Sequence, residues 1–344
     1  MAVLVFDTGR GAGVCLSYVS HYCDDLSADI RGSLFLLWLV VAGHNRSHCL
    51  VGCHLGLASF PSQPLLQGVV IPFMLTETHA HLDYPDFQPD FAEVLRRAEE
   101  AGVTRMISIG TSLESSRKAI ALAESDVRIF AAAGVHPTNA LAVGEDVRAE
   151  LREIAGNRRV VAIGEIGLDY YRLPSRGSEP RAVSDEAYKA AQARIFRQQL
   201  DVAAELGLNV VIHQRDAWED TLEILRDYTG RVRGVYHCFG NSFEQAQEVI
   251  RLGHMISFTG IVTFKNAPLV HDCAKRAGAG DFMVETDCPY LAPAPDRGKR
   301  CEPAYTRLVA ERIASLRGIS LEEVAERTTE NAEQFFRFNR SVDS

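Results

Sequence analysis

The chain has 344 residues, of which 47% are hydrophobic and 24% charged, proportions of a globular protein that exclude a collagen, a coiled coil and a wholly disordered chain. Its 36 basic and 45 acidic side chains give a net charge of −9, which argues against binding nucleic acid by bulk charge alone. The longest apolar run, residues 34–42, is shorter than the ~18 residues that span a bilayer, so we expect no membrane association.

The first 73 residues differ in composition from the rest, with only seven charged side chains, no Lys and no Glu. Three interpretations are open: a targeting sequence, a metal module around Cys49 and Cys53, and an extension that does not fold. A signal sequence fits poorly because the apolar run begins 33 residues into the chain, and the Cys/His spacing matches no standard zinc pattern. We therefore expect residues 1–73 to be a disordered or irregular extension and residues 74–340 to form the folded domain.

From Leu75 onward, short β-branched or apolar runs alternate with longer amphipathic segments. The predicted strands are Leu75–His79, Thr104–Ile109, Arg128–Val135, Val160–Gly164, Asn209–His213, Val232–His237, Met255–Thr259 and Asp281–Glu285. The predicted helices are 89–101, 112–124, 145–155, 184–206, 216–229, 242–250, 266–277 and 304–317, with one or two more over 319–337. Eight strand–helix units in about 250 residues predict an α/β fold of the (β/α)8 TIM-barrel type.

Histidines and carboxylates gather where the predicted strands end, which is the functional end of such a barrel. Five of the seven histidines after Met74 lie there. The candidates are His79, His81, His136, Glu165, His213, His237, Glu285 and Asp287. One histidine in such a place is more often structural than a ligand, but a metal centre accounts for all of them together.

The residue types indicate a pair of metal ions. His79 and His81 alternate along a strand end, so their side chains point to one face. Imidazoles with carboxylates suit Zn, Mn, Fe, Co or Ni, and Mg where water fills several positions. Glu165 could bridge two ions with its two oxygens, and Asp287 could both bind metal and accept the proton of an attacking water.

Six segments, in order along the chain between about Leu75 and Asn339, resemble the TatD family of metal-dependent hydrolases and deoxyribonucleases. They are THAHLDY, GVHPT, IGEIGLDYY, VIHQRDA, YHCFG and ETDCPYLAP. The resemblance implies a TIM barrel of the amidohydrolase superfamily. It also implies hydrolysis of phosphodiester bonds in DNA with two divalent ions per subunit, for which Mg, Mn and Zn are the candidates.

The resemblance also implies a role for each matching residue. The ligands of the family's first metal site correspond here to His79, His81, Glu165 and Asp287. Those of the second site correspond to Glu165, His213 and His237. His136 and Arg215 would face the substrate phosphate, while Asp287, Glu165 and Glu285 would be the catalytic carboxylates.

Other functions remain open at this point. Many amidohydrolases that cleave amides, lactones or phosphotriesters bridge their metals with a carbamylated lysine from strand four, whereas this strand ends in Glu165 with no lysine near it. This favours the TatD resemblance. A phosphodiesterase of small molecules would use the same metal pair, and a non-catalytic barrel would be expected to have lost ligands.

The expected partner is DNA, as single strands or 3′ ends. Arg297, Lys299 and Arg300 follow the last strand, and with Arg172 and Arg215 they could hold two or three phosphates. A solvated loop explains the first three equally well. The cysteines after residue 73 are far apart in sequence, as in a reduced cytoplasmic protein, and nothing implies a stable protein partner.

Overall fold

The structure is a computed structural model that describes residues 73–176 and 183–338. These ranges fall in one unit, Val69–Ser344. The predicted extension, apart from Phe73, lies outside the described residues. None of the helices in the two ranges combines the length and the apolar character that crossing a membrane requires.

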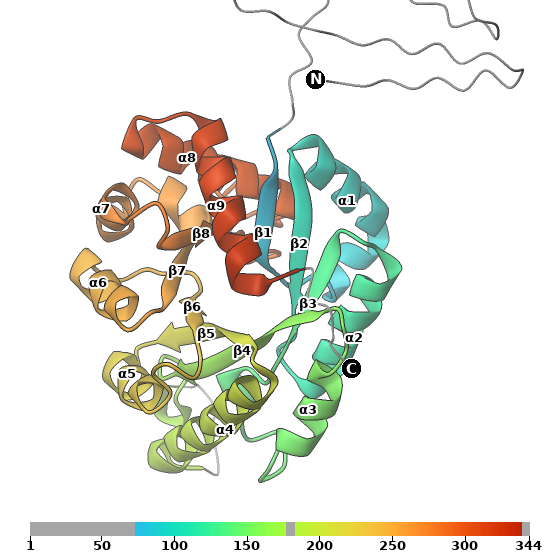
Figure 1. Ribbon diagram of the computed structural model, residues 1–344, viewed down its shortest axis with the longest axis vertical. Coiled ribbons are helices and arrows are strands. Elements are labelled where there is room, and N and C mark those ends of the chain that lie inside the picture. The colour runs from blue at the N-terminus through green and yellow to red at the C-terminus, as the bar shows by residue number, and fades with distance from the viewer. Residues whose placement is uncertain (1–72, 177–182, 339–344) are drawn as a thin grey trace, which may run out of the picture. The chain divides into compact units, whose positions relative to one another are not determined.

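Eight parallel strands form one sheet whose spatial order follows the chain (Figure 1). They are β1 (Leu75–Ala80), β2 (Val103–Ile109), β3 (Ile129–Ala133), β4 (Val160–Asp169), β5 (Asn209–Arg215), β6 (Gly234–Tyr236), β7 (Met255–Phe258) and β8 (Phe282–Val284).

Backbone contacts join the first strand to the last. Ala80 pairs in parallel with Cys288, just beyond β8. The N–H of Asp287 donates to the carbonyl of His79 at 2.9 Å, and the N–H of His81 donates to the carbonyl of Cys288 at 2.8 Å. The predicted (β/α)8 barrel is therefore confirmed, with its closure made by the segments that carry these polar residues.

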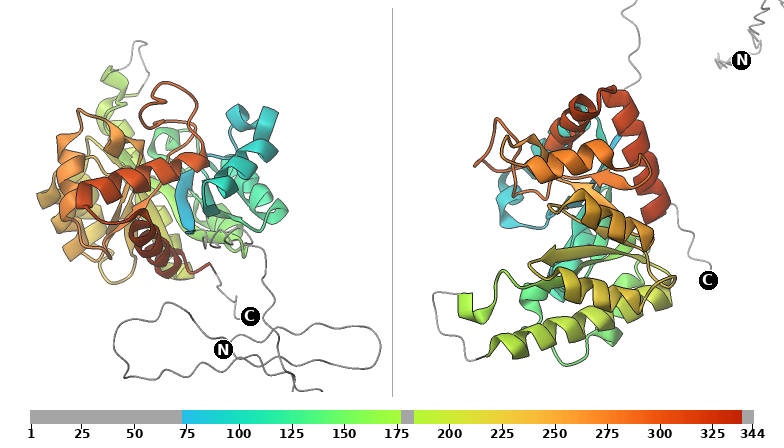
Figure 2. Two further views of the ribbon diagram at one scale, coloured as in Figure 1. Left: turned by 90° about the horizontal axis from the view of Figure 1, so that it is seen from above. Right: turned by 90° about the vertical axis from the view of Figure 1, so that its left-hand side faces the viewer.

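Helices surround the sheet on the outside (Figure 2). They are α1 (Phe91–Glu100), α2 (Leu113–Ser125), α3 (Arg148–Ala155), α4 (Asp185–Leu206), α5 (Trp218–Arg226), α6 (Phe243–Arg251), α7 (Pro268–Arg276), α8 (Thr306–Arg317) and α9 (Leu321–Phe336). Serine side chains cap the starts of α2, α4, α6 and α9 by accepting a backbone N–H of the first turn. Gly207 ends α4 in the left-handed conformation, at φ 61°.

The barrel interior is filled with side chains, and α9 closes its amino-terminal end. Alternate strand residues such as Ile107, Ile109 and Val211 form one buried cluster with Phe335 and Phe336 of α9. The side-chain amide of Asn331 donates to the carbonyl of Phe282 at the start of β8, at 2.8 Å. The carboxyl ends of the strands are thus left as the open end of the barrel.

Several strands end at other residues than predicted. These differences decide whether a candidate residue lies on a strand or on the loop that follows it. β4 continues to Asp169, five residues past Gly164, because residues 166–169 pair with 212–215 of β5. Gly167 is needed for this pairing: at φ 140°, a Cβ there would collide with the carbonyl oxygen of His213. Conversely, β6 ends before His237 and β8 before Glu285, so these side chains stand on the loops that follow.

Candidate metal centre

Glu165 lies at the centre of the candidate residues. Its Oε1 is 2.7 Å from Nδ1 of His213 and 2.8 Å from Nε2 of His237. Its Oε2 faces the other way, 3.6 Å from Nε2 of His79 and 3.9 Å from Nε2 of His81. The two oxygens of one carboxylate therefore address two separate histidine pairs, the arrangement expected of a group that bridges two ions.

Asp287 completes the group around the first histidine pair. Its Oδ1 is 3.3 Å from Nε2 of His81 and 3.6 Å from Nε2 of His79. Asp287 has a positive φ of 61°, which is unfavourable for a residue with a Cβ, and the hydrogen bond from its N–H to the carbonyl of His79 helps to hold it there. The structure thus gathers one set of His79, His81, Asp287 and Glu165 Oε2, and a second set of His213, His237 and Glu165 Oε1.

The donors in these sets fit divalent ions. His79 is 0% exposed, yet neither of its ring nitrogens has a hydrogen-bond partner among the described residues. A buried polar atom without a partner is costly, and an ion between His79, His81 and the two carboxylates would supply one for Nε2. Nitrogens and carboxylate oxygens ~3–4 Å apart match ligands that each lie about 2.0–2.2 Å from a shared ion.

The two carboxylates and His79 of the first set have charges that suit metal binding. Burial by itself raises the pKa of Glu165, but the imidazoles of His237 and His213 hold it well below its usual value. Burial likewise opposes ionisation of Asp287, yet His81 and His79 lower its pKa. Both carboxylates are therefore anionic at neutral pH. Burial, together with His237, lowers the pKa of His79, which keeps its imidazole neutral and able to donate a lone pair.

Two further carboxylates lie behind the histidines of the second set. Glu285 is 1% exposed, and it accepts hydrogen bonds from the N–H of Cys238 at 2.7 Å and from the hydroxyl of Ser257 at 2.6 Å. The same carboxylate lies 3.6 Å from Nδ1 of His237. Asp169 stands in the same relation to His213, with 3.4 Å between Oδ2 and Nε2. In these places both can fix the orientation of a ligand imidazole.

His136 and Arg215 lie at the edge of this group. The Nε2 of His136 is 3.5 Å from Glu165 Oε1, while its Nδ1 accepts the N–H of Thr138 at 3.2 Å. Burial lowers the pKa of His136 to about 3, so the ring is neutral and carries its hydrogen on Nε2. Arg215 does not reach the centre; its exposed guanidinium lies 3.7 Å from the ring centroid of Tyr171.

Two of the three basic side chains in the loop after β8, Lys299 and Arg300, pair with carboxylates. Arg300 donates to Asp90 at 2.7 and 2.8 Å and to Glu302 at 3.2 Å. Lys299 donates to Asp296 at 2.7 Å. These residues are largely neutralised by carboxylates of the same rim, so they have little charge to spare for phosphates.

Glu77 is a buried acidic residue that the sequence analysis missed, and burial raises its pKa to about 8. It accepts hydrogen bonds from the N–H groups of His79 at 2.9 Å and Thr286 at 3.0 Å, and from the hydroxyl of Thr306. It thereby ties β1 to the segment that carries Asp287. The signal available in the sequence was an acidic residue inside the predicted strand Leu75–His79.

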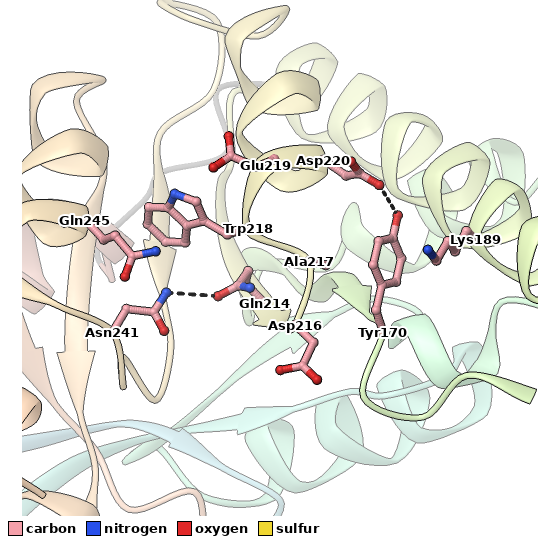
Figure 3. A pocket seen from close by; sticks show the side chains of 10 residues that line it. All are labelled: Tyr170, Lys189, Gln214, Asp216, Ala217, Trp218, Glu219, Asp220, Asn241 and Gln245. Atoms are coloured by element: carbon pink, nitrogen blue, oxygen red, sulfur yellow. Dashed lines mark hydrogen bonds between the residues drawn. The ribbon is translucent and has the colours of Figure 1, made fainter. Parts of the chain in front are cut away.

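A pocket of about 470 Å³ lies at the start of α5, beside Gln214 of β5 (Figure 3). It is bordered by the indole of Trp218 and by the amides of Gln214, Asn241 and Gln245. Gln214 directly follows His213, but none of the candidate metal ligands lines the pocket. Asp216, Glu219 and Asp220 outnumber Lys189 among its charged lining residues, so the pocket lining carries a net negative charge.

Comparisons with known proteins show the family to which the chain belongs. Residues 76–337 match the family described as TatD related DNase. The uncharacterized metal-dependent hydrolase YabD of Bacillus subtilis is 40% identical over 267 residues, which cover 77% of this chain and 100% of that protein. A protein of Enterobacter lignolyticus named 3′-5′ ssDNA/RNA exonuclease TatD is 36% identical over 262 residues, covering 74% of this chain and 96% of that protein.

A solved structure shows the same fold. The TatD homologue YjjV of Escherichia coli K12 aligns with a TM-score of 0.69 and 27% identity, over 76% of this chain and 98% of that chain. Since the family match and the relatives both extend over almost the whole barrel, this chain belongs to the TatD-related DNase family and is a metal-dependent hydrolase.

Proposed function

We propose that this protein is a deoxyribonuclease that trims nucleotides from single-stranded DNA, at 3′ ends, by hydrolysing phosphodiester bonds, and that it acts in the cytoplasm. The observation that carries the proposal is Glu165, whose two oxygens face two histidine pairs. The name of the Enterobacter relative supports single-stranded nucleic acid as the substrate and 3′ ends as the point of attack.

Two divalent ions, with Mg, Mn and Zn as candidates, are proposed at this centre. His79, His81, Glu165 and Asp287 would hold one, and Glu165, His213 and His237 the other. When bound, such a pair activates a water molecule and neutralises charge on a phosphoryl oxygen. Glu285 and Asp169 would keep the rings of His237 and His213 in place, which makes them positioning residues.

Asp287 is the proposed general base. Its side chain is 14% exposed, against 4% for Glu165, so it is the more accessible of the two carboxylates in the ligand sets. Its Oδ1 faces His79 and His81, which leaves Oδ2 to accept the proton of the attacking water. His136 would donate from Nε2 to a phosphoryl oxygen, and Arg215 would contact a phosphate farther out.

The test uses protein freed of metal and single-stranded DNA labelled at one end, with Mg, Mn or Zn added in turn. We expect stepwise shortening from the 3′ end with at least one metal. Glu165→Gln should abolish it and lower the metal content, because an amide nitrogen replaces one bridging oxygen and removes a negative charge. Absence of hydrolysis with every metal, or full activity of the Glu165→Gln variant, would contradict the proposal.

The net charge of −9 and the neutralised basic loop favour one alternative, a phosphodiesterase of small molecules. The same preparations distinguish it: that enzyme would hydrolyse bis(p-nitrophenyl) phosphate with metal and leave the labelled strand intact.

A further inference from the structure

Two exposed tyrosines lie on opposite sides of the barrel's open end. Among residues 73–176 and 183–338, Tyr171 and Tyr290 are the only aromatic members of the set of exposed large hydrophobic side chains, at 51% and 52% exposure. Tyr171 follows β4 and Tyr290 follows β8, strands that stand opposite each other in a sheet ordered β1 to β8. Exposed aromatic rings beside a candidate active site offer flat apolar faces to a ligand.

Tyr290 belongs to an aromatic group beside the first ligand set. Its ring centroid is 6.1 Å from that of Tyr84, at an interplanar angle of 86°, and 6.2 Å from that of His81. Tyr84 in turn stacks on His81, with centroids 4.9 Å apart and planes inclined by 22°. We call Tyr84 and Tyr290 the β8-side platform. Its contact with His81 places it directly beside the proposed metal centre.

Tyr171 forms the corresponding group beside the second ligand set. The guanidinium carbon of Arg215 lies 3.7 Å from its ring centroid, a stacking distance. Arg215 is two residues beyond His213, and it pairs with Asp169 in the β4–β5 register. We call Tyr171 and Arg215 the β4-side platform. The two platforms therefore lie on the β8 and β4 sides of the open end.

We infer that the two platforms stack the unpaired bases on either side of the scissile phosphate, an inference that rests on the proposed function. Every base has a π face, so stacking on tyrosine and arginine holds a strand without reading its sequence. A duplex keeps these faces covered by its own stacking, so the platforms select single strands and frayed ends. Stacking also needs little positive charge, which suits a protein with a net charge of −9.

The test compares a single-stranded oligonucleotide with the same strand carrying abasic tetrahydrofuran residues on both sides of the cleaved bond. Removing a stacked base should cost on the order of tenfold in kcat/KM, so the wild-type protein should cleave the abasic strand ~10–100-fold more slowly. Tyr290→Leu and Tyr171→Leu should slow cleavage of the normal strand by about tenfold each and change cleavage of the abasic strand little. Tyr→Phe at either position should keep the wild-type rate, since stacking needs only the ring.

Val127→Ala serves as the control, because Val127 is 85% exposed and precedes β3, at the opposite end of the barrel. If the wild-type protein cleaves normal and abasic strands equally, the inference is wrong while the proposed function stands. An equal loss on both strands in the Tyr→Leu variants would also overturn it, since the rings would then act on the fold and not on bases. If neither strand is cleaved with Mg, Mn or Zn, the proposed function fails, and the inference fails with it.

Discussion

Asp287 and His213 lie on different sides of Glu165, and this separates their expected roles. Asp287→Asn keeps the size of the side chain and one oxygen ligand but cannot accept a proton. We expect it to lose at least ~10² in kcat even at saturating metal, because the defect lies in the transition state. His213→Ala should instead lose metal affinity and recover much of its rate as metal is raised. The measurement is kcat against metal concentration for both variants.

If added metal fully restores the kcat of the Asp287→Asn variant, Asp287 acts only as a metal ligand and not as a base. Glu285 does not replace it easily as a base, since its oxygens already accept from Cys238 and Ser257.

His254 makes the stability of the barrel depend on pH. It is 3% exposed, and its Nδ1 accepts the N–H of Gly234 at 2.9 Å. Burial lowers its pKa from 6.5 to about 4, so between these values the unfolded chain binds a proton that the folded protein does not. The contribution of His254 to the free energy of unfolding should therefore fall as the pH falls from about 6.5 to about 4.

His254→Asn, which cannot titrate, should show a shallower fall over that range in urea titrations at successive pH values. If the free energy of unfolding falls with the same slope in both proteins, groups other than His254 cause the loss of stability at low pH.

At the scale of secondary-structure elements, Glu77 connects β1 to the segment after β8. It accepts two backbone N–H groups and one hydroxyl, all buried. Glu77→Ala would leave the N–H groups of His79 and Thr286 unpaired, at a cost of about 1–3 kcal/mol for each. Glu77→Gln keeps one acceptor oxygen and should lose less. The midpoints of thermal unfolding of both variants measure these losses of stability. If Glu77→Ala unfolds at the wild-type midpoint, Glu77 does not stabilise the closure of the barrel.

The end of β4 is a place where the local sequence pattern does not predict the structure. The predicted strand Val160–Gly164 ends at the first residue of the run GEIGLD, which contains two glycines. In the structure this run continues β4, because its backbone groups pair with β5 and a glycine allows the close approach at His213. The pairing partner lies over 40 residues away, which a local pattern cannot contain.

For the whole molecule, we propose that residues 1–72 contribute nothing to the stability or activity of the barrel. A chain that begins at Phe73 keeps the packing of its ring near Arg307 and the hydrogen bond from Thr329 to the carbonyl of Met74, at 2.9 Å. It should match the full chain in thermal midpoint and in kcat/KM.

A chain that begins at Thr76 is the matched control and should unfold at lower temperature, because it lacks Leu75, which is 0% exposed. If the chain beginning at Phe73 already unfolds at lower temperature than the full chain, the extension is structural.

The sequence by itself determined the alternation of eight strands and helices, and it identified the polar residues that meet at the open end. Both follow from local rules: hydrophobic periodicity specifies each element, and parallel strands in a barrel bring their carboxyl ends to one rim. It did not determine which oxygen of Glu165 faces which histidine, that Arg300 pairs with Asp90, 210 residues away, or that Arg215 stacks on Tyr171. Those contacts join residues far apart in the chain, so only the closed barrel, which fixes the distance between them, decides their partners.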